Sequence, residues 1–388
     1  MEGRKSDVIR FILLMGFVSL FADLVYESAR GVMGPYLGRL GANAFAIGMI
    51  FGVGEFLGYV LRVVAGVLVD RTRKYWSFIF VGYGLVASIP LLAFPDYWIL
   101  AGTLIVMERI GKALRTPARD TIISIYSGGI GSGKAFGIHE TVDQAGAIVG
   151  SFIFYVILTL GLGYKTGFAI LTIPFLLLIA SLIIAKLFSS RIHIQKQVEE
   201  KVFHNGRKSR KIYFYLLFVL LTSLGFVGFP LIGFHAVKVK VLSEEFIPLF
   251  YSIAMLVDAL IAIPIGIVYD RFGYRIIVIL PILIMLIALL SFSNILILII
   301  LGVLVWGITM SFYETVVRAY IGDNVDIRER GTFYGLFNTV VGVGFGIGNS
   351  VIGYIYETMG ALIVPFIVGL ETIALATILI TVFTERRS

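Results

Sequence analysis

The chain has 388 residues, of which 59% are apolar and only 14% are charged, and its formal net charge is +8. A soluble globular protein has an apolar share nearer half, so we expect a membrane protein. The basic residues are spread over short loops without a patterned recognition element, which argues against a nucleic-acid partner, and the absence of cysteine excludes disulfides and thiolate sites.

Twelve apolar stretches follow one another along the chain, each roughly 19 to 29 residues long. Each is long enough to cross a hydrocarbon layer of about 30 Å as a helix. They are continuously apolar, as in "RIIVILPILIMLIALL", rather than alternating as barrel strands would be. The sequence therefore predicts an all-α membrane protein with twelve transmembrane helices. They lie at roughly 9–37, 43–69, 76–94, 97–118, 133–159, 166–188, 211–237, 245–269, 274–293, 296–321, 331–356 and 361–383.

The first stretch carries Asp23, Glu27 and Arg30 at spacings that place all three on one helical face. A charged side chain at the centre of a bilayer costs about 3 kcal/mol or more, and such residues normally face a protein interior or an aqueous cavity. We therefore expect these three residues to line a transport path.

Two landmarks of the first half of the chain recur in the second half. The second stretch ends in "AGVLVDRTRKYW" and the eighth in "PIGIVYDRFGYR", which puts Asp70 and Asp270 at matching helix ends. The glycines of the fifth stretch recur at the same spacing in the eleventh: Gly137, Gly146 and Gly150, then Gly335, Gly344 and Gly348. This register predicts an internal duplication. We expect two six-helix bundles at 1–188 and 211–388, joined by a cytoplasmic linker at 189–210.

The repeated loop also carries a family resemblance. Gly66, Leu68, Asp70 and Arg71 resemble the loop signature of the major facilitator superfamily, and the run from Gly266 to Arg275 resembles its second copy. The resemblance implies two pseudo-symmetric bundles that rock around a central cavity. It implies that the first and fourth helices of each half line the cavity and that the second and fifth face the other half. The segment "ERIGKALRTPARD" of the fourth helix is similar to one prokaryotic subgroup, which indicates a fold but no cargo.

The repeated loop has a physical use as a latch between the halves. A glycine lets two helices approach closely, and an aspartate at a helix end can accept hydrogen bonds from the N-terminus of a neighbouring helix. We expect Asp70 to hold the halves together on the cytoplasmic side, with Arg119 and Asp120 as its partners. The alternative is a topology signal only. The expected latch residues are Gly66, Asp70, Arg71, Arg119, Asp120, Asp270, Arg271 and Arg318.

Charged residues concentrate on the helices that the resemblance places inside, whereas the third, sixth, ninth and twelfth stretches carry few or none. Burial and neighbouring charges can make protonation of a carboxylate and binding of a cargo mutually exclusive, which is the logic of antiport. The alternative is a set of static ion pairs that fix helix packing. The expected coupling residues are Asp23, Glu27, Arg30, Glu55, Arg62, Glu108, Arg109, Lys112, Glu140 and Asp143.

The glycine pattern of the fifth stretch, from Gly137 to Gly150, resembles the antiporter signature of the superfamily, although Ser151 stands where the signature has proline. The resemblance favours export by antiport. Close helix packing through small residues accounts for the same pattern in either case.

The second half carries fewer charges, and its seventh stretch replaces them with Gly225, Gly228, Pro230 and His235. Glycines beside a proline favour bending of the helix. We expect this half to shape the cargo cavity, with ordinary packing as the alternative for its aromatic residues. The expected cavity residues are Tyr251, Asp258, Trp306, Tyr313, Glu314 and Phe337.

His139 and Asp143 stand four residues apart on one face of the fifth helix. With Asp23 or Glu27 they would provide ligands for a divalent metal ion. The alternative is that His139 is a hydrogen-bonded packing residue.

Lys and Arg gather in the loops that lie on the side of both termini, and the opposite side holds little more than Arg39, Lys165, Lys238 and Lys240. The positive-inside rule therefore places both termini in the cytoplasm and the chain in the cell membrane.

These observations predict a secondary transporter, monomeric, that couples a small molecule to an ion gradient, with H⁺ as the expected coupling ion and export as the direction. We expect the cavity to be acidic, and an acidic cavity favours a cationic or zwitterionic amphipathic cargo over an anion. A divalent-metal exporter is the alternative within transport, and a non-transporting membrane sensor is the alternative from another class. We expect neither a cofactor nor enzyme activity, since no nucleotide-binding loop and no hydrolytic set of residues occurs.

Overall fold

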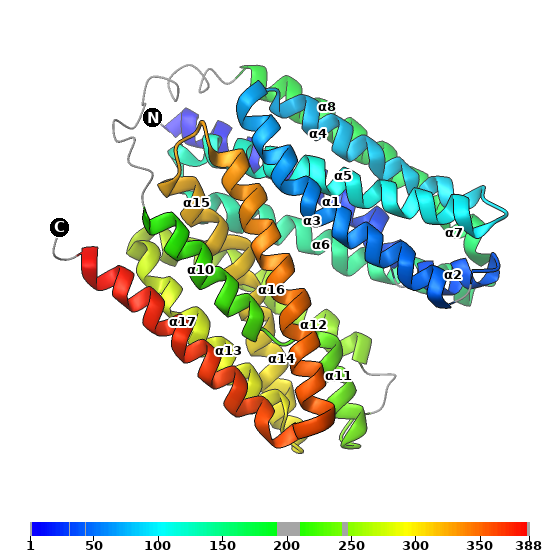
Figure 1. Ribbon diagram of the computed structural model, residues 1–388. Coiled ribbons are helices and arrows are strands. Elements are labelled where there is room, and N and C mark those ends of the chain that lie inside the picture. The colour runs from blue at the N-terminus through cyan, green and yellow to red at the C-terminus, as the bar shows by residue number, and fades with distance from the viewer. Residues whose placement is uncertain (1, 31, 43, 192–209, 243–246, 386–388) are drawn as a thin grey trace.

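The computed structural model describes residues 2–30, 32–42, 44–191, 210–242 and 247–385, and every regular element among them is a helix (Figure 1). Each of the twelve predicted stretches coincides with one helical rod, so the predicted fold class is confirmed. By length and composition alone, seven segments of the described chain qualify as membrane spans. The helix of the fourth stretch is not among them, because it carries too many charges to face lipid.

The first half consists of six rods, several of which are built from more than one helix. Short 3₁₀ turns extend the third rod as far as Ala93. The helices of this half are α1 (Glu2–Arg30), α2 (Met33–Arg39), α3 (Ala44–Thr72), α4 (Tyr75–Gly84), α5 (Trp98–Tyr126), α6 (Ser132–Thr159), α7 (Gly163–Ile170) and α8 (Thr172–Arg191).

The second half repeats this pattern with two interruptions. The seventh rod breaks after Gly225, as its glycines and proline predict, and the tenth rod contains the π-helical segment η6 (Phe312–Val317). The remaining elements are α10 (Arg210–Gly225), α11 (Phe229–Lys238), α12 (Ile247–Phe272), η5 (Gly273–Val278), α13 (Ile279–Ser291), α14 (Leu296–Ser311), α15 (Arg318–Asn324), α16 (Arg330–Met359), η7 (Gly360–Leu362) and α17 (Ile363–Glu385).

The two bundles meet near the end of the molecule where α1 begins and α17 ends (Figure 1). There α3 packs against α16, and α6 packs against α12. Toward the opposite end, which carries α2 and α7 in one half and α11 in the other, the bundles spread apart (Figure 1). The contact between the halves is therefore concentrated on the side of the termini.

Two glycines allow this close contact. A Cβ atom at Gly66 of α3 would overlap the carbonyl oxygen of Gly331 in α16, and a Cβ atom at Gly266 of α12 would overlap that of Gly133 in α6. Only glycine lets the backbones approach this closely. The two contacts repeat one another, as the duplication of the sequence predicts.

The linker predicted at 189–210 falls largely outside the described residues. Within them, α8 continues to Arg191 and α10 begins at Arg210, so the helical part of each half reaches slightly into the predicted linker. The division of the chain at this point stays a prediction.

Candidate functional site

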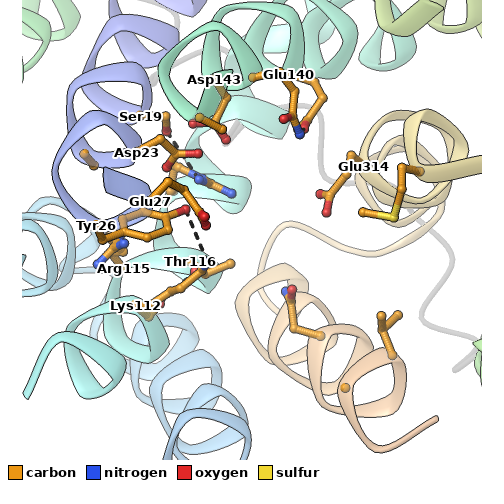
Figure 2. A pocket seen from close by; sticks show the side chains of 18 of the residues that line it. Ser19, Asp23, Tyr26, Glu27, Lys112, Arg115, Thr116, Glu140, Asp143 and Glu314 are labelled. Carbon is orange, nitrogen blue, oxygen red and sulfur yellow. Dashed lines mark hydrogen bonds between the residues drawn. The ribbon is translucent and has the colours of Figure 1, made fainter. Parts of the chain in front are cut away.

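A cavity of about 320 Å³ lies between the two halves. Its wall takes side chains from α1, α3, α4, α5 and α6 of the first half and from α12, α14, η6, α15 and α16 of the second. Figure 2 shows the charged side chains of α1, α5 and α6 on one side, with Glu314 of η6 across the space. Apart from Tyr83 of α4, which belongs to the third stretch, the cavity is therefore built from helices that the sequence placed inside.

The cavity wall contains both basic and acidic residues, and the basic residues are more numerous. Seven are basic: Arg30, Arg62, Arg109, Lys112, Arg115, Arg119 and Arg318. Five are acidic: Asp23, Glu27, Glu140, Asp143 and Glu314. The expectation of an acidic cavity is therefore wrong. The expectation was based on the acidic residues of the inner helices, and Arg115, Arg119 and Arg318 were not expected to line the cavity.

On α1, the predicted face is the cavity face. Asp23 is buried and lines the cavity, and Glu27 accepts a hydrogen bond of 2.8 Å from Arg30. Between them lies Tyr26, whose hydroxyl is 3.3 Å from Lys112 Nζ and whose ring lies 4.6 Å from the same ammonium group. The i, i+4, i+7 spacing thus places the side chains of Asp23, Glu27 and Arg30 in one continuous polar stripe along α1.

Helix α5 carries a second stripe, formed by Glu108, Lys112, Arg115 and Arg119 at intervals of four, three and four residues. Glu108 is only 3% exposed and lies 3.5 Å from Arg115 and 3.8 Å from Arg109. It stands behind the cavity wall as the counter-ion of two arginines. Its expected place in the transport path is corrected accordingly.

Arg119 of α5 and Arg318 of α15 stand 199 positions apart and occupy matching places in the two halves. Arg119 pairs with Asp120 at 2.9 Å and donates to Ser19 at 3.3 Å. Arg318 pairs with Glu314 and lies 3.5 Å from Glu140 of the other half. Both arginines line the cavity, and Asp120 is fully buried beside one of them, so the structure places none of the three at the expected latch.

The latch is formed by other partners. The carboxylate of Asp70 accepts hydrogen bonds from the backbone N–H groups of Gly331 at 2.8 Å and Thr332 at 2.6 Å, at the start of α16. Asp270 accepts the same pair of bonds, each 2.8 Å long, from Gly133 and Lys134 at the start of α6. A helix N-terminus is therefore the partner in both copies, and Arg119 and Asp120 were wrongly expected in that role.

The arginines that follow the two latch aspartates, Arg71 and Arg271, are exposed. The guanidinium of Arg271 lies over its neighbour Phe272 at 5.5 Å from the ring centroid. Arg73 of the same loop was not among the expected latch residues, but its Nε donates to the carbonyl oxygen of Asp70 at 2.9 Å. The backbone of Arg73 has a positive φ of 57°, which the residue type does not predict.

Two of the candidate metal ligands, His139 and Asp143, lie close together, and Glu140 joins them. One ligand atom from each of His139, Glu140 and Asp143 lies within 4.8 Å of the others. The third member is thus Glu140 rather than Asp23 or Glu27. His139 is buried, with Nε2 at 3.0 Å from Ser19 Oγ.

The expected cavity residues of the second half divide into two groups. Tyr251 and Glu314 line the cavity. Four others are buried elsewhere, because the helical register turns their side chains into the bundle: Asp258, Trp306, Tyr313 and Phe337.

The apolar part of the cavity wall comes from residues that sequence analysis did not single out. The large ones are Met255, Met310, Val341 and Phe345 of the second half, and the first half adds Ala22 and Ala147. Nothing distinguishes them from packing residues in the sequence, because apolar positions are common on every face of these helices.

Two expected coupling residues lie on α3. Arg62 lines the cavity, and its guanidinium lies 5.2 Å from the ring centroid of Tyr59. Glu55 belongs to the same helix, but its side chain lies outside the described residues.

Comparison with known proteins agrees with this geometry. A family model described as the Major Facilitator Superfamily matches residues 14–238 and 216–388. An uncharacterized protein of Mycobacterium tuberculosis (strain ATCC 25618 / H37Rv) is 35% identical over 376 residues, which span 94% of this chain and 91% of the relative.

Two solved structures are similar in fold. The human organic anion transporter MFSD10 (TETRAN) superposes with a TM-score of 0.71 at 13% identity, covering 96% of this chain and 99% of its own. A variant of the E. coli fucose:proton symporter FucP superposes with a TM-score of 0.67 at 15% identity and covers 99% of both chains.

Proposed function

This chain belongs to the major facilitator superfamily, and from that premise we propose that it exports a small zwitterionic, amphipathic molecule by alternating access, in exchange for protons. Membership of the superfamily supports secondary transport by a multi-pass membrane protein. The choice of cargo, coupling ion and direction rests on the cavity.

The observation that carries the proposal is the division of the cavity wall. The side formed by α1, α5 and α6 is charged, with Asp23, Lys112 and Arg115 among its residues. The second half contributes an apolar part of the wall, including Met310 and Phe345, as well as the charged residues Glu314 and Arg318. A molecule with a charged head and an apolar body fits such a wall. Since basic residues outnumber acidic ones, a head group that carries both charges is favoured over a pure cation.

The coupling carboxyls are proposed to be Asp23 and Asp143. They lie on the same side of the cavity, from α1 and α6 (Figure 2), close enough for their charges to interact. Oδ1 of Asp143 has no hydrogen-bond partner among the described residues. An ammonium group on the cargo and a proton would compete for this pair, and such competition is what antiport requires.

We place both termini in the cytoplasm, because Lys and Arg gather in the loops on that side. The cavity is formed within one chain, so a monomer suffices for transport.

The test uses proteoliposomes with a trapped pH dye and an imposed pH gradient. Three probes share one apolar body: phenethyltrimethylammonium, 3-phenylpropionate and the betaine of phenylalanine. We expect the betaine to cause the largest proton flux above that of protein-free vesicles. Asp23→Asn is expected to lower this flux about tenfold or more, because one charge-assisted contact is lost. Asp96→Asn, which changes an exposed surface acid, is the matched control.

A divalent-metal exporter is the second candidate, favoured by the close approach of His139, Glu140 and Asp143. Arg318 lies 3.5 Å from Glu140 and already supplies a positive charge at this carboxylate. This contact weighs against a metal ion at the same place. If Ni²⁺, Co²⁺ or Zn²⁺ discharges the pH gradient while the organic probes do not, and His139→Ala stops this flux, the metal candidate replaces the first.

A further inference from the structure

Carboxylates and a lysine occupy different ends of the cavity. Figure 2 shows Glu140 and Asp143 of α6 near one end of the space and Lys112 of α5 near the other. All three side chains line the cavity. A cargo that carries both charges would therefore meet opposite charges at opposite ends.

The end at α6 holds more carboxylates than cations. One oxygen of Glu140 and one of Asp143 lie within 4.8 Å of each other. Arg318 lies 3.5 Å from Glu140 and pairs with Glu314, and no other lysine or arginine of the described residues lies within 4 Å of these three acids. Glu140 is only 2% exposed, yet its Oε2 and Oδ1 of Asp143 accept no hydrogen bond within the described chain. Buried carboxylate oxygens of this kind favour a cation in the cavity beside them.

The end at α5 carries an ammonium group without a carboxylate partner. Lys112 Nζ lies 3.3 Å from the hydroxyl of Tyr26 and 4.6 Å from the centroid of its ring. In the part of the chain that the structure describes, no carboxylate lies within 4 Å of this nitrogen, and Glu108, one turn away, pairs with Arg115 at 3.5 Å. An ammonium group has three donors, so two of them stay available to an acid group.

The two ends are farther apart than the charges of an α-amino acid, which share one carbon atom. Ser127 follows α5 directly and Ser132 begins α6, and a hydrogen bond of 3.0 Å joins their hydroxyls, so these helix ends lie level. Lys112 stands 15 residues before Ser127, and Glu140 stands 8 residues after Ser132. At about 1.5 Å per residue, Lys112 and Glu140 differ in height by about 10 Å, and Lys112 and Asp143 by about 6 Å. Side chains tilt toward the N-terminus of their helix, which moves Lys112 and Glu140 farther apart.

The second half presents an apolar side chain between these two levels. Ser132 donates to Asp323 of α15 at 2.5 Å, so the end of the tenth rod lies level with the start of α6. Glu314 stands 9 residues before Asp323, and Met310 stands one turn farther, at 13 residues. These positions correspond to heights of about 14 and about 20 Å, against about 12 Å for Glu140 and about 22 Å for Lys112. An apolar body can therefore contact Met310 while the charged groups reach both ends.

We propose that the cargo is a zwitterion whose ammonium and acid groups stand at opposite ends of an apolar body. This inference rests on the proposed function and narrows its cargo. The ammonium group binds at Glu140 and Asp143, and the acid group binds at Lys112. The reverse orientation would bring like charges together at both ends. The cation is thereby placed at Asp143, one of the proposed coupling carboxyls.

The test measures binding to the full chain in detergent by isothermal titration calorimetry, so it needs neither a membrane nor a gradient. Phenylalanine betaine is compared with its constitutional isomer para-(trimethylammoniomethyl)phenylacetate. The two probes have the same atoms and the same charges, but the para isomer holds its charges at opposite ends of the ring. We expect the para isomer to bind about tenfold more tightly, because it reaches both ends of the cavity at once.

Two further probes each lack one charge and test the orientation. The acetamide of the para isomer lacks the negative charge, and para-neopentylphenylacetate lacks the positive charge. Lys112→Met is expected to weaken binding of the para isomer and of the neopentyl probe about tenfold, and to leave binding of the acetamide unchanged. Lys165→Met, at an exposed lysine of α7, is the matched control and should bind all probes as the wild type does.

Glu140→Gln is expected to show the opposite selectivity: weaker binding of the para isomer and of the acetamide, without weaker binding of the neopentyl probe. Because this change also removes a partner of Arg318, Asp143→Asn is measured as a second variant and should show the same selectivity. Glu357→Gln, at an exposed acid of α16, is the matched control.

Three results would overturn the inference. Equal binding of the two isomers, together with proton flux driven by phenylalanine betaine, overturns it and leaves the proposed function in place. A Lys112→Met variant that loses affinity for the acetamide rather than for the neopentyl probe overturns the orientation. Absence of binding by every probe overturns the inference and the proposed cargo together.

Discussion

At the residue scale, charge is tolerated inside this apolar molecule because most buried ions have a partner in place. Glu108 stands between Arg109 and Arg115, Arg119 pairs with Asp120, and so each charge has a counter-ion within 4 Å. Buried pairs add little net stability, because desolvation offsets most of their attraction. Their presence in the interior therefore indicates a functional use of the charges rather than a need of the fold.

The pairing makes a prediction for Glu108, which is 3% exposed. Glu108→Gln removes the carboxylate beside the buried Arg115 and the half-buried Arg109, and this should lower the free energy of unfolding by about 3 kcal/mol or more. The measurement is thermal unfolding in detergent. The control is Asp96→Asn, since the bond from Lys165 to Asp96 joins two exposed side chains and should contribute at most about 1 kcal/mol. Equal effects of the two substitutions would contradict this view of the interior pairs.

At the element scale, the contact between α3 and α16 depends on small residues at fixed places. The latch bonds of Asp70 form only where Gly66 lets the start of α16 approach. The same holds for Asp270, Gly266 and the start of α6. Each latch therefore needs both an acceptor at one helix end and a gap beside it.

Gly66→Ala tests this dependence. The added Cβ overlaps the backbone of Gly331, so the variant should lose about 1–3 kcal/mol of stability through strain. Gly346→Ala is the matched control, because no atom outside its own helix lies within 4 Å of a Cβ there, and alanine is the better helix former. Melting temperatures of both variants provide the measurement. An unchanged melting temperature for Gly66→Ala would show that α3 and α16 can separate freely.

The sequence contains enough information to predict the elements. Run length determines the spans, and the i, i+4, i+7 spacing of Asp23, Glu27 and Arg30 identifies the cavity face of α1. The partners of a side chain on another helix are harder to predict. Asp70 bonds to residues 261 and 262 positions away, and no local pattern specifies which helix N-terminus it meets.

The composition of the cavity wall was less predictable for the same reason. In the tenth rod, Met310 and Glu314 line the cavity whereas Trp306 and Tyr313 do not, because a shift of one residue turns a side chain by about 100°. Glu371 is buried although it is a single acid in the apolar run of α17, which the sequence predicts to be a lipid-facing support helix.

At the scale of the whole molecule, the duplicated latches give the structure two matching contacts on one side of the cavity. Both lie at the end where the bundles meet, and the opposite end is spread apart (Figure 1). Alternating access requires that these contacts break when the cavity opens toward the termini. In the proposed antiport, the cavity charges would meet cargo and proton in both states.

The proposed antiport requires that cargo and proton compete for Asp23 and Asp143. The most direct measurement is the pH change on adding phenylalanine betaine to the purified, weakly buffered protein in detergent. We predict that the wild type releases protons as the probe binds, and that a variant with Asp23→Asn and Asp143→Asn releases none. Proton uptake on binding would contradict the claim, because cargo and proton would then bind together, as in a symporter.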